Sequence, residues 1–300
     1  MYKLFKIFLI IFLILNQNLV FAAQKYVSIS PALTEIIYAL NAQDNLIGVS
    51  NSCDYPIDAK KKEKIGDAYF INEEKILKLK PDFILALDYS YPVLKKFEKY
   101  GITPICLQYP DIDTIYKNII TLGRLTNKEQ NAKKIVANIK SKIEKTHSNR
   151  QYKILYLLQL EPMITIGQKS FITDVIKKSG QKSVTDNLNS FYPVISEEYA
   201  IKSKPDIIIL TFPFDTKRLK QLFPTSKIIT LTKEENDIIN RPSIRIYKAV
   251  EYFSNLTISN SPNIKWCNWT VWRELFSEIF KRFFINFFNI IKHFKSSFDN

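Results

Sequence analysis

The sequence predicts an α/β protein with two similar lobes, each built on a parallel sheet, joined by a long backbone helix. From residue 26 onwards, short β-branched runs alternate with helical patterns, which is typical of βα units. Residues 72–82 and 196–206 share six of eleven residues at a constant offset of 124, which indicates an internal repeat. Between the two copies lies a proline-free stretch with helical spacing. These observations place one α/β unit on each side of a helical connection.

Composition excludes several classes of function. The six glycines are never clustered, so neither a P-loop nor a G-x-G-x-x-G turn can form. Two histidines rule out a multi-histidine metal site and leave almost no candidate for a histidine-based triad. No catalytic residue and no metal ligand is therefore predicted. The net charge of +14 suits capture of an anionic ligand or reflects general lysine richness, and the scattered lysines do not predict nucleic-acid binding.

Residues 1–22 have the pattern of a secretory signal peptide. Lys3 and Lys6 precede an apolar run of about nine residues, and small residues follow, with cleavage expected after Ala22. An uncleaved membrane anchor is the alternative, but the apolar run is short for a bilayer, which needs about 20 residues. The mature chain is expected to be exported.

The first predicted lobe covers residues 23–112. Asn72 is placed to cap a helix whose first turn carries two glutamates, and these suit the positive end of the helix dipole. The continuous apolar run 83–87 is typical of a strand buried on both faces of a parallel sheet. The expected strands are 26–29, 46–49, 83–87 and 104–107, and the expected helices are 31–40, 72–79 and 91–100.

The second predicted lobe covers residues 151–256 and repeats the plan of the first. The pairs Glu73/Glu197 and Glu74/Glu198 begin the two copies, and Lys-Pro-Asp ends each of them before a buried strand. In the second lobe these strands are expected at 207–211 and 228–231.

The connection, residues 113–150, is expected to be helical from about Asp113 to Lys145. Residues 127–146 alone would span about 30 Å as a helix. Such a rigid strut allows only limited rotation of the lobes. A ligand is expected between them, at the strand ends, where α/β sheets place their crevices.

The three cysteines, Cys53, Cys106 and Cys267, leave two possibilities open. A Cys53–Cys106 disulfide is compatible with an oxidising compartment, and free buried thiols are equally compatible with the sequence.

Several short segments, in this order and spacing, resemble the periplasmic binding proteins of iron-siderophore and cobalamin ABC importers, and the cobalamin-binding branch most of all. The resemblance covers about residues 24–256 and implies two α/β lobes with a helical backbone. The segments that carry it are Ser28-Ile29-Ser30-Pro31-Ala32-Leu33-Thr34-Glu35, Ile47-Gly48-Val49, Cys53-Asp54-Tyr55-Pro56, Leu79-Lys80-Pro81-Asp82 and Asn240-Arg241-Pro242-Ser243-Ile244-Arg245.

The resemblance also implies a ligand, a cobalamin-like corrinoid, with ferric siderophore or haem as the alternatives and no separate cofactor. Three positions depart from the family pattern, because Ser52, Ala68 and Leu87 stand where aromatic residues are usual. Neighbouring aromatics can supply the same area, unless they serve core packing; these are Tyr69, Phe70, Tyr89 and Tyr91. The implied ligand residues are Asp67, Tyr69, Phe70 and Leu87 in the first lobe and Gly167, Tyr192, Asp237 and Arg241 in the second.

Glu74 and Glu198 match the glutamates, one per lobe, that dock on the family's ABC permease dimer with its ATPase subunits. Two like charges at equivalent positions suit a partner with two-fold symmetry. The simpler alternative is that both are helix-start carboxylates.

Residues 257–300 lie outside the resemblance. Aromatic residues recur every three or four positions among basic ones, which predicts membrane-surface contact by an amphipathic helix over 264–298. Packing on the body as an extra helix, or a poorly ordered extension, is the alternative. The chain is expected in the periplasm. An exported enzyme and a membrane-attached interaction protein remain rival hypotheses, but no acid–base or nucleophilic constellation supports the former.

Overall fold

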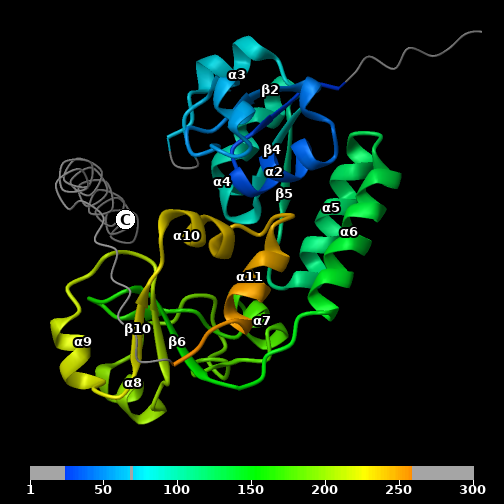
Figure 1. Cartoon of the computed structure of the whole chain (residues 1–300). Helices are drawn as coiled ribbons and strands as arrows, with labels where there is room; N and C mark the ends of the chain where they lie inside the picture. Colours follow the sequence, from blue (N-terminus) through cyan, green and yellow to red (C-terminus); the bar gives the residue numbers. More distant parts are fainter. Residues whose placement is uncertain (1–23, 68–69, 259–300) are drawn as a thin grey trace, which may run out of the picture. The chain divides into compact units, whose positions relative to one another are not determined.

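The computed structural model describes residues 24–67 and 70–258, in which two sheets are connected by helices (Figure 1). The first sheet is parallel, in the order β3-β2-β1-β4-β5. Its strands are β1 (Tyr26–Ser28), β2 (Leu46–Val49), β3 (Glu63–Lys64), β4 (Phe83–Leu87) and β5 (Thr103–Leu107).

The second sheet has the order β10-β9-β6-β7, with β8 paired to the start of β6. It is parallel except for β7, which runs antiparallel to the end of β6. Its strands are β6 (Lys153–Gln159), β7 (Ile164–Thr165), β8 (Lys182–Ser183), β9 (Ile207–Leu210) and β10 (Lys227–Thr230). The prediction of two α/β lobes with parallel sheets is confirmed.

Helices follow the strands in both lobes. The segment expected as one helix over 91–100 is divided into a short α-helix and a 3-10 helix, η4 (Lys95–Tyr100). The α-helices of the first lobe are α2 (Pro31–Ala39), α3 (Glu73–Leu79) and α4 (Tyr91–Leu94). Those of the second lobe are α7 (Phe171–Lys178), α8 (Glu197–Ser203), α9 (Lys217–Leu222), α10 (Lys233–Asn240) and α11 (Ile246–Ser254).

The repeat seen in the sequence is also a repeat of local structure. The side chains of Asn72 and Ser196 cap α3 and α8 by accepting hydrogen bonds from backbone N–H groups three residues on. Both helices end in a lysine with left-handed backbone, φ 50° at Lys80 and φ 47° at Lys204. The equivalence of the two copies therefore extends to their helix caps.

The aspartates that end the two copies have the same role. Asp82 accepts a hydrogen bond from the backbone N–H of Lys25 at 2.7 Å, and Asp206 from that of Lys153 at 2.8 Å. Each carboxylate thus fixes the start of the central strand of its own sheet, β1 or β6.

The prediction of a single connecting helix over 113–145 is wrong, because this segment forms two helices. These are α5 (Ile112–Leu125) and α6 (Glu129–Glu144), which lie side by side (Figure 1). Asn127 adopts left-handed backbone (φ 56°) in the turn, a conformation that asparagine tolerates better than most residues. Gly123 permits the close approach, since a Cβ there would lie 2.5 Å from that of Ala132.

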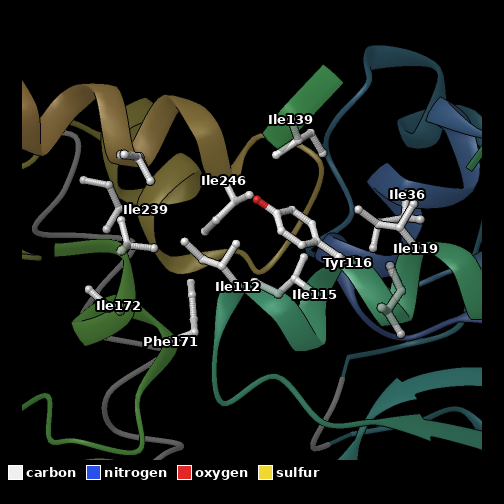
Figure 2. Packing of buried hydrophobic residues seen from close by; sticks show 14 of the residues in the cluster. Ile36, Ile112, Ile115, Tyr116, Ile119, Ile139, Phe171, Ile172, Ile239 and Ile246 are labelled. Atoms are coloured by element: carbon white, nitrogen blue, oxygen red, sulfur yellow. The ribbon is translucent and has the colours of Figure 1, made fainter. Parts of the chain in front are cut away.

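One hydrophobic cluster continues from the first lobe through α5 and α6 to the second (Figure 2). Alternate residues of each sheet enter it, for example Leu85 of β4 and Ile209 of β9. The intervening residues enter a separate cluster on the other face of their own sheet, as Ile84 and Ile208 do. The lobes therefore share apolar packing on one side in addition to their covalent connection.

Candidate functional site

The carboxyl ends of the parallel strands in the two lobes face one another, as contacts between lobes establish. Asp54, which follows β2, pairs with Lys233, which follows β10. Tyr109, which follows β5, lies close enough to Tyr192 of the second lobe for Tyr192 to raise the pKa of its hydroxyl. The candidate site lies at this junction, where the sequence predicted it.

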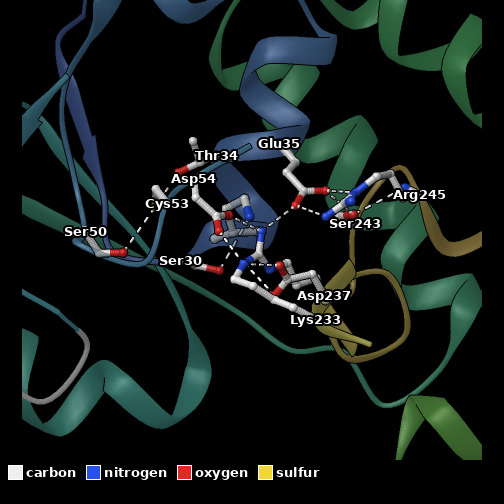
Figure 3. Close-up of polar contacts among 12 residues, drawn as sticks. Ser30, Thr34, Glu35, Ser50, Cys53, Asp54, Lys233, Asp237, Ser243 and Arg245 are labelled. Carbon is white, nitrogen blue, oxygen red and sulfur yellow. Dashed lines mark hydrogen bonds and ion pairs between the residues drawn. The ribbon is translucent and has the colours of Figure 1, made fainter. Parts of the chain in front are cut away.

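A buried glutamate of the first lobe anchors the junction (Figure 3). Glu35 lies on α2, and its side chain has no exposed surface. Arg245 donates to it from Nε at 2.8 Å and from Nη2 at 2.6 Å, and the Ser243 hydroxyl donates at 2.7 Å. A bidentate arginine–carboxylate pair of this kind combines charge with fixed geometry. The pair joins α2 to the segment between α10 and α11.

Towards solvent the junction continues through Arg241. Its Nη1 donates to Glu35 at 3.1 Å and to Asp54 at 2.8 Å, and its Nη2 donates to Asp237 at 2.8 Å. Lys233 donates to Asp54 at 2.9 Å and to Asp237 at 2.7 Å. We term these connected side chains the inter-lobe network (Figure 3). Its members are Glu35, Asp54, Lys233, Asp237, Arg241, Ser243 and Arg245.

Charge within the inter-lobe network perturbs the carboxyl group of Asp54. Burial alone would raise its pKa, but hydrogen bonds from Arg241 and Lys233 lower the pKa of Asp54 to about 2. Hydrogen bonds to Asp237 and Asp54 raise the pKa of Lys233 in turn. The ion pairs of Asp54 with Arg241 and with Lys233 therefore persist at neutral pH.

The loop that carries Asp54 is held from both sides. The Tyr55 ring lies 4.3 Å from the Arg245 guanidinium, a cation–π contact between the lobes. The buried thiol of Cys53 is within hydrogen-bonding distance of the hydroxyls of Ser50 and Thr34, at 3.1 and 3.2 Å. Cys53 and Cys106 are both free, so of the two possibilities left open by the sequence, the structure has the unbridged one.

Aromatic side chains form the second part of the junction. Burial raises the pKa of Tyr109 well above its ordinary value, and Tyr192 and Tyr89 are among the groups that raise it further. The Tyr109 ring also meets that of Phe171 edge-on, with 5.9 Å between ring centroids. Tyr89 and Tyr192 are about half exposed, so aromatic surface from both lobes reaches solvent here.

Gly167 supports the loop that presents Tyr192. Its N–H donates to the carbonyl of Phe191 at 3.0 Å, and a Cβ at this position would lie 2.3 Å from the carbonyl oxygen of Ser190. The residue is buried, so the structure places it behind the loop. Its contact with the Tyr192 loop gives Gly167 a positioning role at the junction.

The remaining predicted ligand residues lie at the carboxyl edge of the first sheet. The Asp67 carboxylate accepts a hydrogen bond from the N–H of Phe70 at 2.8 Å, and the Phe70 side chain is exposed. Leu87 is buried at the end of β4, two residues before Tyr89. Tyr69 lies outside the described residues, as do the segment expected to be a signal peptide, residues 1–22, and the tail 259–300.

Glu74 and Glu198 occupy the second position of α3 and α8, and both are exposed. Their neighbours Glu73 and Glu197 instead pair within their own lobes, with Lys96 and Arg218. Among the described residues, Glu198 has its ion pair along its own helix, with the exposed Lys202. The two glutamates thus present carboxylates at equivalent positions.

Sequence reasoning assigned no role to several residues of the junction. Glu35 carried a signal, because a carboxylate among the apolar residues Ile36 and Ile37 of a helix needs a buried partner. Lys233 carried none, because surface lysines are common in this chain. The other residues without an assigned role were Asp54, Tyr109, Ser243 and Arg245.

No cluster of three or more His, Cys, Asp or Glu side chains in residues 24–67 and 70–258 has an arrangement that could hold a metal ion. No helix in the same part of the chain is both long and apolar enough to cross a bilayer.

Two α/β lobes whose carboxyl strand edges face each other, with a helical connection on one side, define the class of bilobal solute-binding proteins. Residues 27–231 match the family described as periplasmic binding protein. The chain belongs to this family, as the resemblance predicted.

Similar proteins include a vitamin B12-binding protein of Vibrio vulnificus, 30% identical over 76% of this chain and 88% of that protein. A structure of a possible iron-binding (periplasmic solute-binding) protein from Staphylococcus epidermidis is 27% identical, with a TM-score of 0.68 over 77% of this chain and 97% of that one. The periplasmic vitamin B12-binding protein BtuF of Vibrio cholerae is 26% identical, with a TM-score of 0.64 over 77% and 95%.

Proposed function

We propose that this protein is the substrate-binding component of an ABC importer. It captures a corrinoid, a cobalamin-like metal chelate, between its lobes and delivers it to a permease dimer with its ATPase subunits. Its similarity to proteins named as vitamin B12-binding supports this ligand class. The bound chelate is cargo, and the protein itself needs no resident cofactor and performs no catalysis.

The observation that carries the proposal is the meeting of aromatic side chains from both lobes. A flat macrocycle binds by burying its faces against aromatic area, with a few polar groups to orient it. Tyr89 and Tyr109 of the first lobe and Tyr192 of the second lobe supply that area. In the absence of ligand, Tyr109 and Tyr192 approach each other across the lobes. A bound ligand would take the place of this contact.

The test is titration of the purified protein with cyanocobalamin, followed by intrinsic fluorescence. We expect a Kd tighter than about 10 μM, and at least a tenfold loss in Tyr192→Ala, since an aromatic anchor contributes 2 kcal/mol or more, about thirtyfold. The matched control is Tyr100→Ala, an equally exposed tyrosine at the opposite edge of the first sheet.

Two results would contradict the proposal. One is the absence of cyanocobalamin binding, and the other is an equal effect of the two tyrosine substitutions. Haemin and a ferric siderophore are titrated in parallel, because the relative from Staphylococcus epidermidis is named as a possible iron-binding protein. Tighter binding of either would transfer the proposal to that ligand.

Docking on the permease is assigned to Glu74 and Glu198. The repeat supports this, because it presents the two carboxylates from equivalent helices while the adjacent glutamates are paired within each lobe. The double charge reversal Glu74→Lys/Glu198→Lys should leave ligand affinity unchanged and abolish stimulation of the permease ATPase in proteoliposomes. Glu144→Lys, on the connecting helix, is the control and should retain stimulation.

The proposed location is the periplasm, consistent with the family. Cleavage near Ala22 and membrane-surface contact by residues 264–298 belong to this proposal, since both segments lie outside the described residues. Sequencing the amino terminus of the exported protein tests the first. Vesicle flotation of the full chain and of a chain ending at residue 258 tests the second.

A further inference from the structure

We propose that Asp54 is a specificity-determining residue. By pairing with Lys233 and Arg241 of the second lobe, it makes the junction favour a chelate without net charge over one that carries free carboxylates. This inference rests on the proposed function and specifies the charge of the ligand.

Charge at the junction is balanced. The inter-lobe network contains three cations, Lys233, Arg241 and Arg245, and three carboxylates, Glu35, Asp54 and Asp237. All three cations come from the second lobe. Each of them is within 3.1 Å of at least one carboxylate oxygen. A protein with a net charge of +14 thus has no net charge in this network.

Asp54 is the most exposed carboxylate of the network and the first lobe's counterpart of Asp237, which also pairs with both Lys233 and Arg241 and is 24% exposed. Its two oxygens pair with different cations, Oδ1 with Arg241 at 2.8 Å and Oδ2 with Lys233 at 2.9 Å. The side chain of Asp54 is 28% exposed, whereas that of Glu35 is fully buried. Asp54 therefore occupies donors that an incoming carboxylate would otherwise bind.

The competition favours Asp54 because it is part of the same chain. A tethered carboxylate acts at an effective concentration in the millimolar range or above, so a ligand carboxylate must displace an ion pair that is already formed. A neutral chelate needs only hydrogen bonds and aromatic contact, and it leaves the inter-lobe network intact.

The inter-lobe network and the aromatic side chains belong to one junction. Asn240, the residue before Arg241, accepts a hydrogen bond from the hydroxyl of Tyr156 at 3.1 Å. Both parts also follow the carboxyl ends of parallel strands: Asp54 follows β2 and Lys233 follows β10, while Tyr89 follows β4 and Tyr109 follows β5. A ligand held against Tyr192 would therefore lie near the charges of the network.

The test compares two probes whose flat macrocycles are similar in size but whose charges differ. Cyanocobalamin has no net charge, and haemin carries two propionates. The variant is Asp54→Asn, which keeps the shape and an acceptor oxygen but leaves the junction with one excess positive charge. The control is Asp58→Asn, the same charge change four residues on, at an exposed residue whose ion pair with Lys61 stays within the first lobe.

We expect Asp54→Asn to lower the ratio of the haemin Kd to the cyanocobalamin Kd by at least tenfold, and the effect to shrink in 0.5 M salt. Asp58→Asn should leave the ratio unchanged. Lys233→Gln gives the junction one excess negative charge, so it should raise the ratio, which provides an independent test if Asp54→Asn folds poorly.

The inference is overturned if Asp54→Asn changes the ratio by less than twofold, or if the control changes it equally. A ratio that Lys233→Gln lowers would also overturn it. If the wild-type protein binds no cyanocobalamin, the proposed function itself fails, and this result is distinct because it requires no variant.

Discussion

The two lobes match in one region and differ in another. Around α3 and α8 they agree in helix length, in capping, in the left-handed lysine and in the aspartate that holds the central strand. At the carboxyl edges of the sheets they differ, because carboxylates of the first lobe face arginines and a lysine of the second. The two copies are thus alike where they cap a helix and anchor a central strand, and they differ where the lobes contact each other.

This difference has a physical reason. Two identical edges would bring like charges together, and like charges at short range repel. Opposite charges let each edge satisfy the polar groups of the other, which allows Glu35 to be fully buried between them. The asymmetry of the edges is therefore what holds the lobes together on the solvent side of the shared core.

The largest loss of stability is expected from a substitution at the buried centre of the junction between the lobes. Glu35→Gln removes the charge that compensates Arg245, whose side chain is only 7% exposed. We expect a loss of about 3–5 kcal/mol in the free energy of unfolding, because an uncompensated buried charge remains. Urea denaturation measures it. Glu144→Gln, at an exposed position, should change stability by less than about 0.5 kcal/mol, and a similar small effect at Glu35 would contradict the role of the junction.

A smaller effect tests the region where the lobes agree. Asp82→Ala and Asp206→Ala each remove a carboxylate that accepts a backbone hydrogen bond at the start of a central strand. We expect each to cost about 1.5–3 kcal/mol, as hydrogen bonds to charged groups do, and the two losses to agree within about 0.5 kcal/mol. Thermal unfolding against Asp186→Ala, an exposed control, measures both. Losses that differ severalfold would mean that the copies are not equivalent in energy.

The smallest effect concerns protonation of Asp54. Its folded-state pKa of about 2 is below the ordinary value of 3.8, so its contribution to stability is complete above about pH 5 and is lost as the pH falls towards 2. Because the site is partly exposed, this contribution amounts to about 1 kcal/mol. Unfolding of wild type and Asp54→Asn from pH 2 to 7 measures it: the gap between them should close at the acid end. A constant gap would show that the pairing does not depend on the charge of Asp54.

The sequence predicted the lobes well and the junction poorly. Capping residues, the repeat and buried strands are local signals, so α3, β4 and β9 were predicted with nearly correct bounds, and the repeat indicated α8. The turn at Asn127 was missed, because the apolar spacing of α5 and α6 continues across it without a proline or glycine at the break. The helix α10 was not predicted either. It carries Lys233 and Asp237 of the inter-lobe network, and Arg241 follows directly after its last residue.

The sequence alone determined that the chain has two α/β units, that they repeat, and which family they resemble, because periodicity, capping and short motifs are properties of neighbouring residues. Only the tertiary structure decided that the segments around Glu35, Asp54 and Arg241 meet in one network. Pairing between residues about 190 to 210 positions apart depends on how the two lobes pack, and no local pattern encodes which lysine or arginine faces which carboxylate.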